Sequence, residues 1–401
     1  MKNRILCHRV CCNRIPDVVG LSNGGGCVPN VYSLILAGGS GKRLWPISRT
    51  KLPKQMIVID GVKTLLEKTI DRFSAIDSLP HCACKHQTCV CVWRHRQWVV
   101  TTDAYAQDIK ALCGDKVEQV IIEPAAKNTA PALLLSCLKL YEQDPDALLV
   151  VTPADHVVGQ EDRFIATIQE ACAYALTHDA LVIVGVAVRE PLSCYGYIEI
   201  EEKPVSMTAD RAEHTKEQHA AHEVSESRVH RVKMFHEKPS VAVAQWYVDM
   251  PTMLWNCGIV CVRVSVLLEE FKTHAPELYY AMTHHEEPRA ESIDDALLEK
   301  SQRLFAVVGD FAWSDVGSLE AFIAAADSAH PPKNQINLMG AQGNSVYSHR
   351  MYSHKVVVCA GVQDICVIDT PDVLLIMPRS EHQCTVDIVD ELTQHGFQEY
   401  T

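Results

Sequence analysis

A glycine-rich loop directly after a short apolar strand is the feature that most restricts what this chain can fold into. The strand from Tyr32 to Leu36 runs into Ala37-Gly38-Gly39-Ser40-Gly41-Lys42-Arg43, and Pro53-Lys54-Gln55 follows closely. Glycines allow backbone N–H groups to approach an anion without a Cβ in the way, and the cations neutralise its charge. The pattern therefore predicts a phosphate-binding loop at the carboxyl end of a strand.

Two common nucleotide-binding loops do not fit these residues. A dinucleotide-binding fingerprint that starts at Gly39 needs a glycine at position 44, where this chain has Leu44. A P-loop needs Ser or Thr after Gly41-Lys42, and Arg43 stands there instead. The loop is therefore expected to be a third type of nucleotide cradle.

Strand-length apolar runs alternate with helical patterns through the first half of the chain. Strands are expected at 33–36, 89–93, 117–122, 147–152 and 181–186, and helices at 65–74, 101–112, 131–141 and 162–176. Such alternation is typical of an α/β fold with a parallel or mixed sheet that helices cover on both faces. Ligands of these sheets bind beyond the carboxyl ends of strands, where the glycine loop and Pro153-Ala154-Asp155-His156 both fall.

The later part of the chain changes character twice. Residues 202–229 are rich in Glu, His, Ala and Ser and are interpreted as a solvated insertion. Short strands, followed by a helix from Val386, are expected after residue 330 at 343–347, 355–359, 365–369 and 373–377. The sequence therefore predicts a large domain over 31–330 and a small β-rich domain over 331–401.

Composition excludes several classes of function. The formal net charge is −13, so a nucleic-acid backbone or an anionic membrane is not expected as the main partner. The sequence contains no run of 18 apolar residues, so no transmembrane helix is expected. Residues 1–30 lack the apolar core of a signal peptide. We therefore expect a cytoplasmic protein in which residues 1–30 are a disordered or non-native leader. A small anionic substrate is still allowed by the local cations Lys42, Arg43, Arg49, Lys51 and Lys54.

The 17 cysteines are interpreted as reduced, mostly buried thiols. A cluster at Cys82, Cys84, Cys89 and Cys91 raises the alternative of a zinc site. Its C-x-C pairs differ from the usual spacing of zinc ligands, and residues 89–92 alternate like a strand. The spacing therefore does not favour zinc.

Two acidic residues are candidate ligands for a different metal ion. Asp155 comes directly after the expected strand at 147–152, and Asp315 lies in Trp313-Ser314-Asp315-Val316-Gly317. Carboxylates from two distant segments could share one Mg²⁺ and leave coordination positions for phosphate oxygens and water. Each aspartate taken alone is more often a turn or cap residue, and the sequence does not show that the two meet.

Polar groups near other strand ends are candidates for recognising a sugar or a base. Glu237-Lys238-Pro239 follows an apolar strand, and Trp255-Asn256-Cys257-Gly258 precedes another. Acid, amide and ammonium groups in these positions suit sugar hydroxyls and a sugar phosphate. Glu123-Pro124 and Lys127-Asn128-Thr129-Ala130-Pro131 predict a helix entry with a polar cap, and the same groups could read the edge of a purine. An ordinary surface turn is the alternative for each motif by itself.

Eight motifs occur along the chain in an order known from one family. They are the loop at 36–55 and the segments 123–131, 153–156, 195–199, 235–239, 255–258, 292–294 and 313–317. Together they resemble the bacterial-type mannose-1-phosphate guanylyltransferases, within the sugar nucleotidyltransferase superfamily. The resemblance covers about residues 31–385. It implies a Rossmann-like mixed sheet of the GT-A type and a small C-terminal β-rich domain similar to a short left-handed β-helix.

The resemblance also implies a reaction and its participants. GTP and mannose 1-phosphate would give GDP-mannose and diphosphate, by in-line attack of the sugar phosphate on the α-phosphorus. Mg²⁺ would be the cofactor, and the protein would be a homodimer. Because the chain ends at residue 401, neither the isomerase domain that is fused to some family members nor its activity is expected here.

Roles for individual residues follow from the same resemblance. Arg43 would contact the leaving diphosphate, and Lys54 would contact the α-phosphate or the sugar phosphate. Asp155 and Asp315 would hold Mg²⁺. The implied nucleotide-binding residues are Leu36, Ala37, Gly38, Gly39, Ser40, Gly41, Lys42, Glu123, Asn128 and Thr129, and the implied sugar-binding residues are Gly196, Glu237, Lys238 and Asn256.

Two alternatives stay open. The first is a nucleotidyltransferase that uses another nucleotide and another hexose 1-phosphate, because Lys127 stands where the resembling family usually has Arg and lacks its planar fork. The second is a non-catalytic nucleotide-sugar sensor on the same fold. A sensor would be expected to lose a metal carboxylate or the loop lysine, whereas Asp155, Asp315 and Lys54 are all present.

Overall fold

The computed structural model describes residues 30–78, 94–205, 227–329, 335–348, 356–381 and 384–401. The expected leader, the cysteine cluster at 82–91, the expected strand at 89–93 and most of the insertion at 202–229 lie outside these residues. Asn30, which the sequence assigns to the leader, is the first residue of a strand.

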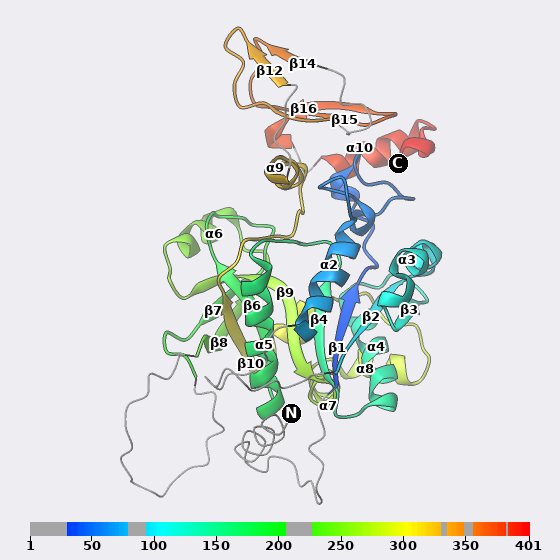
Figure 1. The fold of residues 1–401 in the computed structure, drawn as a ribbon, viewed down its shortest axis with the longest axis vertical. Helices are drawn as coiled ribbons and strands as arrows, with labels where there is room; N and C mark the ends of the chain where they lie inside the picture. Colours follow the sequence, from blue (N-terminus) through cyan, green and yellow to red (C-terminus); the bar gives the residue numbers. More distant parts are fainter. Residues whose placement is uncertain (1–29, 79–93, 206–226, 330–334, 349–355, 382–383) are drawn as a thin grey trace, which may run out of the picture.

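A nine-stranded mixed sheet forms the centre of the large domain (Figure 1). Its strand order is β3-β2-β1-β4-β9-β6-β10-β8-β7. β1 is parallel to β2 and β4, whereas β9 runs antiparallel between β4 and β6. The mixed α/β sheet expected from the sequence is thereby confirmed. The strands are β1 (Asn30–Leu36), β2 (Arg94–Thr102), β3 (Gln119–Glu123), β4 (Leu148–Pro153), β6 (Leu181–Ala187), β7 (Tyr197–Ile200), β8 (Val229–His236), β9 (Met253–Arg263) and β10 (Leu304–Gly309).

Helices cover both faces of this sheet (Figure 1). In β1, Tyr32 and Leu34 are buried in one core cluster, and Val31 is buried in the cluster that contains α5. A strand covered on both faces reads as a continuous apolar run, which explains its sequence. The helices are α2 (Leu65–Ser74), α3 (Ala106–Cys113), α4 (Thr129–Gln143), α5 (Glu161–Thr177), α6 (Val241–Val248), α7 (Val264–His274), α8 (Pro276–Thr283) and α9 (Leu319–Ala329).

Shorter elements lie beside the loops that matter for function. Two 3-10 helices, η1 (Lys42–Leu44) and η2 (Lys54–Met56), follow the glycine loop, and the π-helical turn η6 (Asp294–Leu298) follows α8. β5 (Val157–Val158) and β11 (Trp313–Ser314) form a small antiparallel pair. No helix in the described part of the chain is long and apolar enough to cross a membrane.

One expected helix begins too early. The sequence predicts a helix over 101–112, but Thr101 and Thr102 are the last residues of β2 and α3 begins at Ala106. Thr102 has the extended backbone of a cap residue, before a 3-10 helix at Asp103–Tyr105. Thr101 is fully buried and donates to the carbonyl of Ala37 at 2.9 Å. Sheet contacts therefore override the local helix-start pattern at these threonines.

The C-terminal segment, which the sequence predicts as a small domain, combines parallel and antiparallel strand pairs. β12 (Gln335–Leu338) is parallel to β14 (Val357–Ala360), and β13 (Ser345–Ser348) is parallel to β15 (Ile365–Asp369). β16 (Leu374–Pro378) runs antiparallel to β15 and is followed by α10 (Thr385–Gln394). These strands lie at one end of the molecule, next to α9 and α10 (Figure 1).

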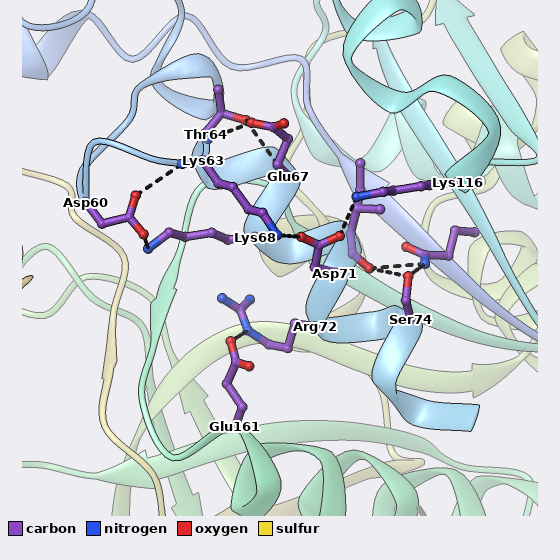
Figure 2. A network of polar contacts seen from close by, with 12 residues as sticks. Asp60, Lys63, Thr64, Glu67, Lys68, Asp71, Arg72, Ser74, Lys116 and Glu161 are labelled. Atoms are coloured by element: carbon purple, nitrogen blue, oxygen red, sulfur yellow. Dashed lines mark hydrogen bonds and ion pairs between the residues drawn. The ribbon is translucent and has the colours of Figure 1, made fainter. Parts of the chain in front are cut away.

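Helix α2, which begins after the glycine loop, is fixed by a polar network (Figure 2). Thr64 Oγ1 accepts from the N–H of Glu67 at 3.1 Å, and Glu67 Oε2 accepts from the N–H of Thr64 at 2.8 Å, which completes a capping box. Lys63 and Lys116 both pair with Asp71, at 2.5 and 2.7 Å. The expected helix at 65–74 is thus confirmed with its bounds, because its start is encoded locally.

Replacing Thr64 by alanine is expected to destabilise the protein by about 1 kcal/mol, since the first turn of α2 loses its capping acceptor. Urea unfolding would measure this free energy. The matched control is Thr273→Ala, because Thr273 is on the exposed face of α7 and its hydroxyl donates to Glu269 O within the same helix. Equal stability of the two variants would contradict the prediction.

Candidate active site

The backbone of the glycine loop is anchored on both sides. Gln55 Nε2 and Thr101 Oγ1 donate to the carbonyl of Ala37 at 2.8 and 2.9 Å. Gly41 has a φ of +70°, and a Cβ at this position would collide with the side chain of Lys54. Ser48 Oγ donates to Gly41 O at 2.6 Å. Glycine is required at position 41 because the backbone there is left-handed and packed against Lys54.

Lys54 joins the two candidate metal ligands. Its Nζ lies 2.8 Å from Asp155 Oδ2 and donates to the backbone carbonyl of Asp315. Burial raises the pKa of Asp155, but Lys54 and His156 outweigh this effect and hold the pKa below its ordinary value. Asp155 is therefore ionised at neutral pH. One ammonium group thus ties η2 to the segments that follow β4 and β11.

Pairing of β5 with β11 brings Asp155 and Asp315 to the same place. Ser314, which precedes Asp315, lies opposite Val157, which is two residues after Asp155. Asp315 Oδ1 accepts from Tyr195 OH at 2.9 Å and from the N–H of Gly317 at 2.8 Å. The orientation of the Asp315 carboxylate is therefore fixed by the protein itself.

His156 is a site residue for which the sequence predicts no role, although it lies in the motif at 153–156. Its Nδ1 lies 3.2 Å from Trp313 Nε1, which can only donate, so the proton of a neutral ring is on Nε2. Nε2 lies 3.8 Å from Asp155 Oδ1. Burial lowers the pKa of His156 to about 4, so the ring is neutral at pH 7. His156 therefore links the Trp313 segment to Asp155.

A cavity of about 210 Å³ opens next to this cluster. Among the residues expected at the site, Leu36, Thr129, Gly196, Glu237, Lys238, Asn256 and Asp315 line it. The lining residues that the expected set lacks are Val151, Pro153, His156, Cys194, Tyr195, Gly258, Val260, Ile293, Asp294 and Trp313. Segments from β1, β4, β9 and the loops after β8 and α8 therefore converge on one space.

The part of the cavity with polar walls is built around Gly196. A Cβ at Gly196 would lie 3.0 Å from Glu237 Oε2 and 3.5 Å from Asn256 Cβ, so a larger residue would crowd both groups. Asn256 Nδ2 lies 3.5 Å from Asp294 Oδ1, and Lys238 pairs with Glu237. Carboxylate, amide and ammonium groups thus face one another here, as hydroxyl recognition requires.

Asp294 is another lining residue that the expected set lacks. Burial, and then the charge of Glu237, raise the pKa of Asp294 to about 6. The residue opens the π-helical turn η6, an irregularity that is frequent at functional sites. The motif at 292–294 could have indicated it, but the sequence does not show that this loop reaches Asn256.

Glu123 ends β3 with only 6% of its surface exposed. Its Oε1 lies over Gly38, where any Cβ would collide with it. Burial raises the pKa of Glu123 to about 7. Asn128 Oδ1 accepts from the N–H of Thr129 at 2.8 Å, and Thr129 Oγ1 accepts from the N–H of Ile293 at 2.9 Å. The predicted polar cap of α4 is therefore confirmed at Asn128.

Several expected residues lie outside the cavity lining. Lys42 and Arg43 are exposed on η1, Gly39 is exposed, and Ser40 is partly exposed. Lys127 is not among the lining residues and pairs with Glu287 at 2.5 Å. These loop residues form an open edge next to the cavity, whereas Lys54 is buried within the site.

The donor set fits a hard divalent cation. The carboxylate of Asp155 and the backbone carbonyl of Asp315 hold the ammonium of Lys54, and the Asp315 carboxylate accepts from Tyr195 and Gly317, so the oxygen atoms gathered here favour positive charge. In the described part of the chain, no group of three or more His, Cys, Asp and Glu side chains could hold a metal by itself. Mg²⁺ is commonly bound by one or two carboxylates together with substrate phosphates and water, which suits this arrangement.

Comparison with known proteins identifies the family of the chain. Residues 32–330 match the protein family described as nucleotidyl transferase. Mannose-1-phosphate guanylyltransferase of Escherichia coli K12 is 30% identical over 391 residues, which cover 92% of this chain and 75% of that protein. Alginate biosynthesis protein AlgA of Pseudomonas aeruginosa is 30% identical over 387 residues, which cover 90% of this chain and 72% of that protein.

A solved structure shares the fold over nearly the whole length. The crystal structure of mannose-1-phosphate geranyltransferase from Thermus thermophilus superposes with a TM-score of 0.70 at 25% identity. The superposition covers 91% of this chain and 99% of that one. The chain belongs to the nucleotidyl transferase family, in its branch of mannose-1-phosphate guanylyltransferases.

Proposed function

We propose that the protein transfers GMP from GTP to mannose 1-phosphate and releases diphosphate. Relatives named for this reaction span most of the chain. The observation that carries the proposal is the placement of Lys54 between Asp155 and Asp315, at the edge of a cavity with polar walls. This is a phosphate site next to a space for a polar ligand.

The chemistry needs positioning and charge neutralisation more than proton transfer. A sugar phosphate is already an anion at pH 7, so it attacks the α-phosphorus without a general base. Lys54 is proposed to leave Asp155 for a phosphate oxygen when the substrates bind. The exposed Lys42 and Arg43 are proposed to contact the leaving diphosphate, together with the backbone N–H groups from Gly38 to Gly41.

Asp155 and Asp315 are proposed to hold Mg²⁺. Bound there, the ion would neutralise charge on the phosphate oxygens. Tyr195 and Gly317 fix the carboxylate of Asp315, and His156 faces that of Asp155. Preorganised partners of this kind reduce the cost of arranging ligands during the reaction.

The two ends of the cavity are proposed to recognise different parts of the substrates. Glu237, Lys238 and Asn256 would bind hydroxyls and the phosphate of mannose 1-phosphate, and Gly196 leaves room for the ring. Glu123 would accept hydrogen bonds from N1 and N2 of guanine. Asn128 and Thr129 would lie near the base while they hold the start of α4.

Diphosphate release tests this function directly. The assay supplies GTP, ATP, UTP or dTTP with mannose 1-phosphate or glucose 1-phosphate, in the presence of Mg²⁺. We expect GTP with mannose 1-phosphate to give at least about tenfold higher kcat/KM than any other pair, because recognition by hydrogen bonds rejects mismatched groups strongly. Faster turnover with UTP or dTTP would favour another nucleotidyltransferase, and no release by folded protein would favour a sensor.

Three coarser features complete the proposal. Parallel pairing of β12 with β14 and of β13 with β15 supports a short left-handed β-helix in the C-terminal domain. A homodimer and a cytoplasmic location stay predictions from the sequence. Sedimentation of the purified chain would test the dimer.

A further inference from the structure

The loop that carries Lys42 and Arg43 is held from behind by the C-terminal part of the chain. Trp45 Nε1 donates to the carbonyl of Tyr400 at 2.7 Å, and Thr385 Oγ1 donates to the carbonyl of Arg43 at 3.1 Å. Trp45 is only 4% exposed, so its indole N–H has little access to water. These contacts lie on the side of the loop that packs against the C-terminal domain.

Arg49 is the centre of this junction. Its Nη1 donates to the carbonyl of Tyr400, and its Nη2 donates to Thr370 Oγ1 at 3.3 Å and to Asp372 Oδ1 at 2.8 Å. The guanidinium also lies over the ring of Trp45, 5.8 Å from its centroid. The sequence places Arg49 among the cations that could attract phosphate, but its side chain is directed to the C-terminal domain instead.

Apolar packing connects the same domain to the segment that carries Asp315. Leu44 of the loop and Val316, which follows Asp315, are buried in one cluster with Ile368 of β15 and Met377 of β16. Leu44 is 1% exposed, and Val316 and Ile368 are fully buried. The C-terminal domain therefore supports both the cationic loop and the segment that carries Asp315.

We propose that Arg49 is a positioning residue for the nucleotide loop. By joining the loop to Asp372, Thr370 and Tyr400, it holds residues 38–45 in the conformation that receives the triphosphate. The planar fork of arginine serves several acceptors at fixed angles, which an ammonium group does not reproduce. The inference rests on the proposed function only in that the loop binds a nucleotide.

Two full-length variants test this role. Arg49→Gln removes the charged fork, and Asp372→Asn removes its ionic partner without touching the loop. In both we expect amide hydrogen exchange at residues 38–48 to rise and the Kd for Mg-GTP to weaken, each by about tenfold, as for the loss of a charge-assisted hydrogen bond. The KM for mannose 1-phosphate is expected to change less than about twofold, because the cavity around Asn256 is not part of the junction.

The matched control is Arg163→Gln, which breaks an exposed ion pair with Asp310 on the surface of the large domain. It is expected to leave exchange and GTP affinity unchanged. Arg49→Lys keeps the positive charge but lacks the planar fork. We expect it to recover only part of the GTP affinity that Arg49→Gln loses. Because Asp372 is 47% exposed, Asp372→Asn is expected to fold even where Arg49→Gln does not.

Two outcomes would overturn the proposal. Unchanged exchange and unchanged Kd in Asp372→Asn overturn the proposal. Loss of GTP affinity in Arg49→Gln, with full recovery in Arg49→Lys and no effect in Asp372→Asn, would instead show direct contact with phosphate and also overturn it. Hydrogen exchange needs no substrate, so it still reports on the loop in a protein that fails to turn over GTP.

Discussion

Asp155→Asn is expected to lower kcat by about 1000-fold, because the site loses a carboxylate that is proposed to hold the Mg²⁺ that would neutralise charge on the phosphate oxygens. The carboxylate is ionised and lies 2.8 Å from Lys54 Nζ, so the substitution removes the proposed Mg²⁺ ligand and the ionic partner of a buried ammonium. Steady-state diphosphate release measures kcat. Thermal unfolding measures whether the fold is kept.

The control for Asp155→Asn is Asp310→Asn, since Asp310 is an exposed aspartate that pairs with Arg163 on the surface. A second readout is Mn²⁺ binding, followed by electron paramagnetic resonance in the presence of GTP. We expect Asp155→Asn to weaken it and Asp310→Asn to leave it unchanged. If the kcat of Asp155→Asn stays within about threefold of that of the parent protein, Asp155 has no catalytic role.

Glu123→Gln is expected to lower kcat/KM for GTP by about 10- to 100-fold, because guanine offers two donors and hydrogen bonds to a charged acceptor are the stronger ones. A carboxylate accepts from both N1–H and N2–H₂, whereas an amide has one oxygen and adds a competing donor. Glutamine pairs readily with adenine, so the preference for GTP over ATP is expected to fall as well. Competition between GTP and ATP measures this preference.

The affinity for GTP is expected to depend on pH through the ionisation of Glu123. The pKa of Glu123 is about 7 because of its burial, so the ionised fraction rises as the pH increases from about 6 to 8. GTP affinity of the parent protein is therefore expected to rise over this range relative to Glu123→Gln. Stability changes in the opposite direction, since a carboxyl group with a raised pKa stabilises the fold when protonated and loses that contribution as the pH rises through 7.

Glu118→Gln is the matched control for Glu123→Gln, because Glu118 precedes the same strand and is an exposed partner of Arg96. It is expected to change neither base preference nor its pH dependence. If Glu123→Gln retains the GTP preference of the parent at every pH, the nucleobase is read elsewhere in the site.

Local features explain what the sequence could predict. The capping box at Thr64 and Glu67 encodes the start of α2 within four residues. The glycine loop can be recognised because it directly follows the apolar strand β1. The fold class follows from strand-length apolar runs that alternate with helical patterns. Where a local pattern competes with the sheet, as at Thr101 and Thr102, the tertiary contact prevails and the prediction is wrong.

Contacts between distant segments explain what the sequence could not predict. Asp155 and Asp315 approach each other through the short pair of β5 and β11, which no periodicity reveals. The bond between His156 and Trp313 and the approach of Asp294 to Asn256 depend on loops from different parts of the chain. The residue types are visible in the sequence, whereas their orientation is a property of the folded sheet.

The junction between the loop and the C-terminal domain also has a consequence for synthesis. Trp45 and the carbonyl to which it donates, that of Tyr400, are 355 residues apart. At about 5–20 residues per second, a ribosome needs about 20–70 s between them. The nascent chain therefore contains β1 and the glycine loop long before the residues that brace the loop exist. We expect ribosome-bound chains that lack the C-terminal domain to be cleaved readily by protease near residues 38–50, and to become resistant when Tyr400 has emerged.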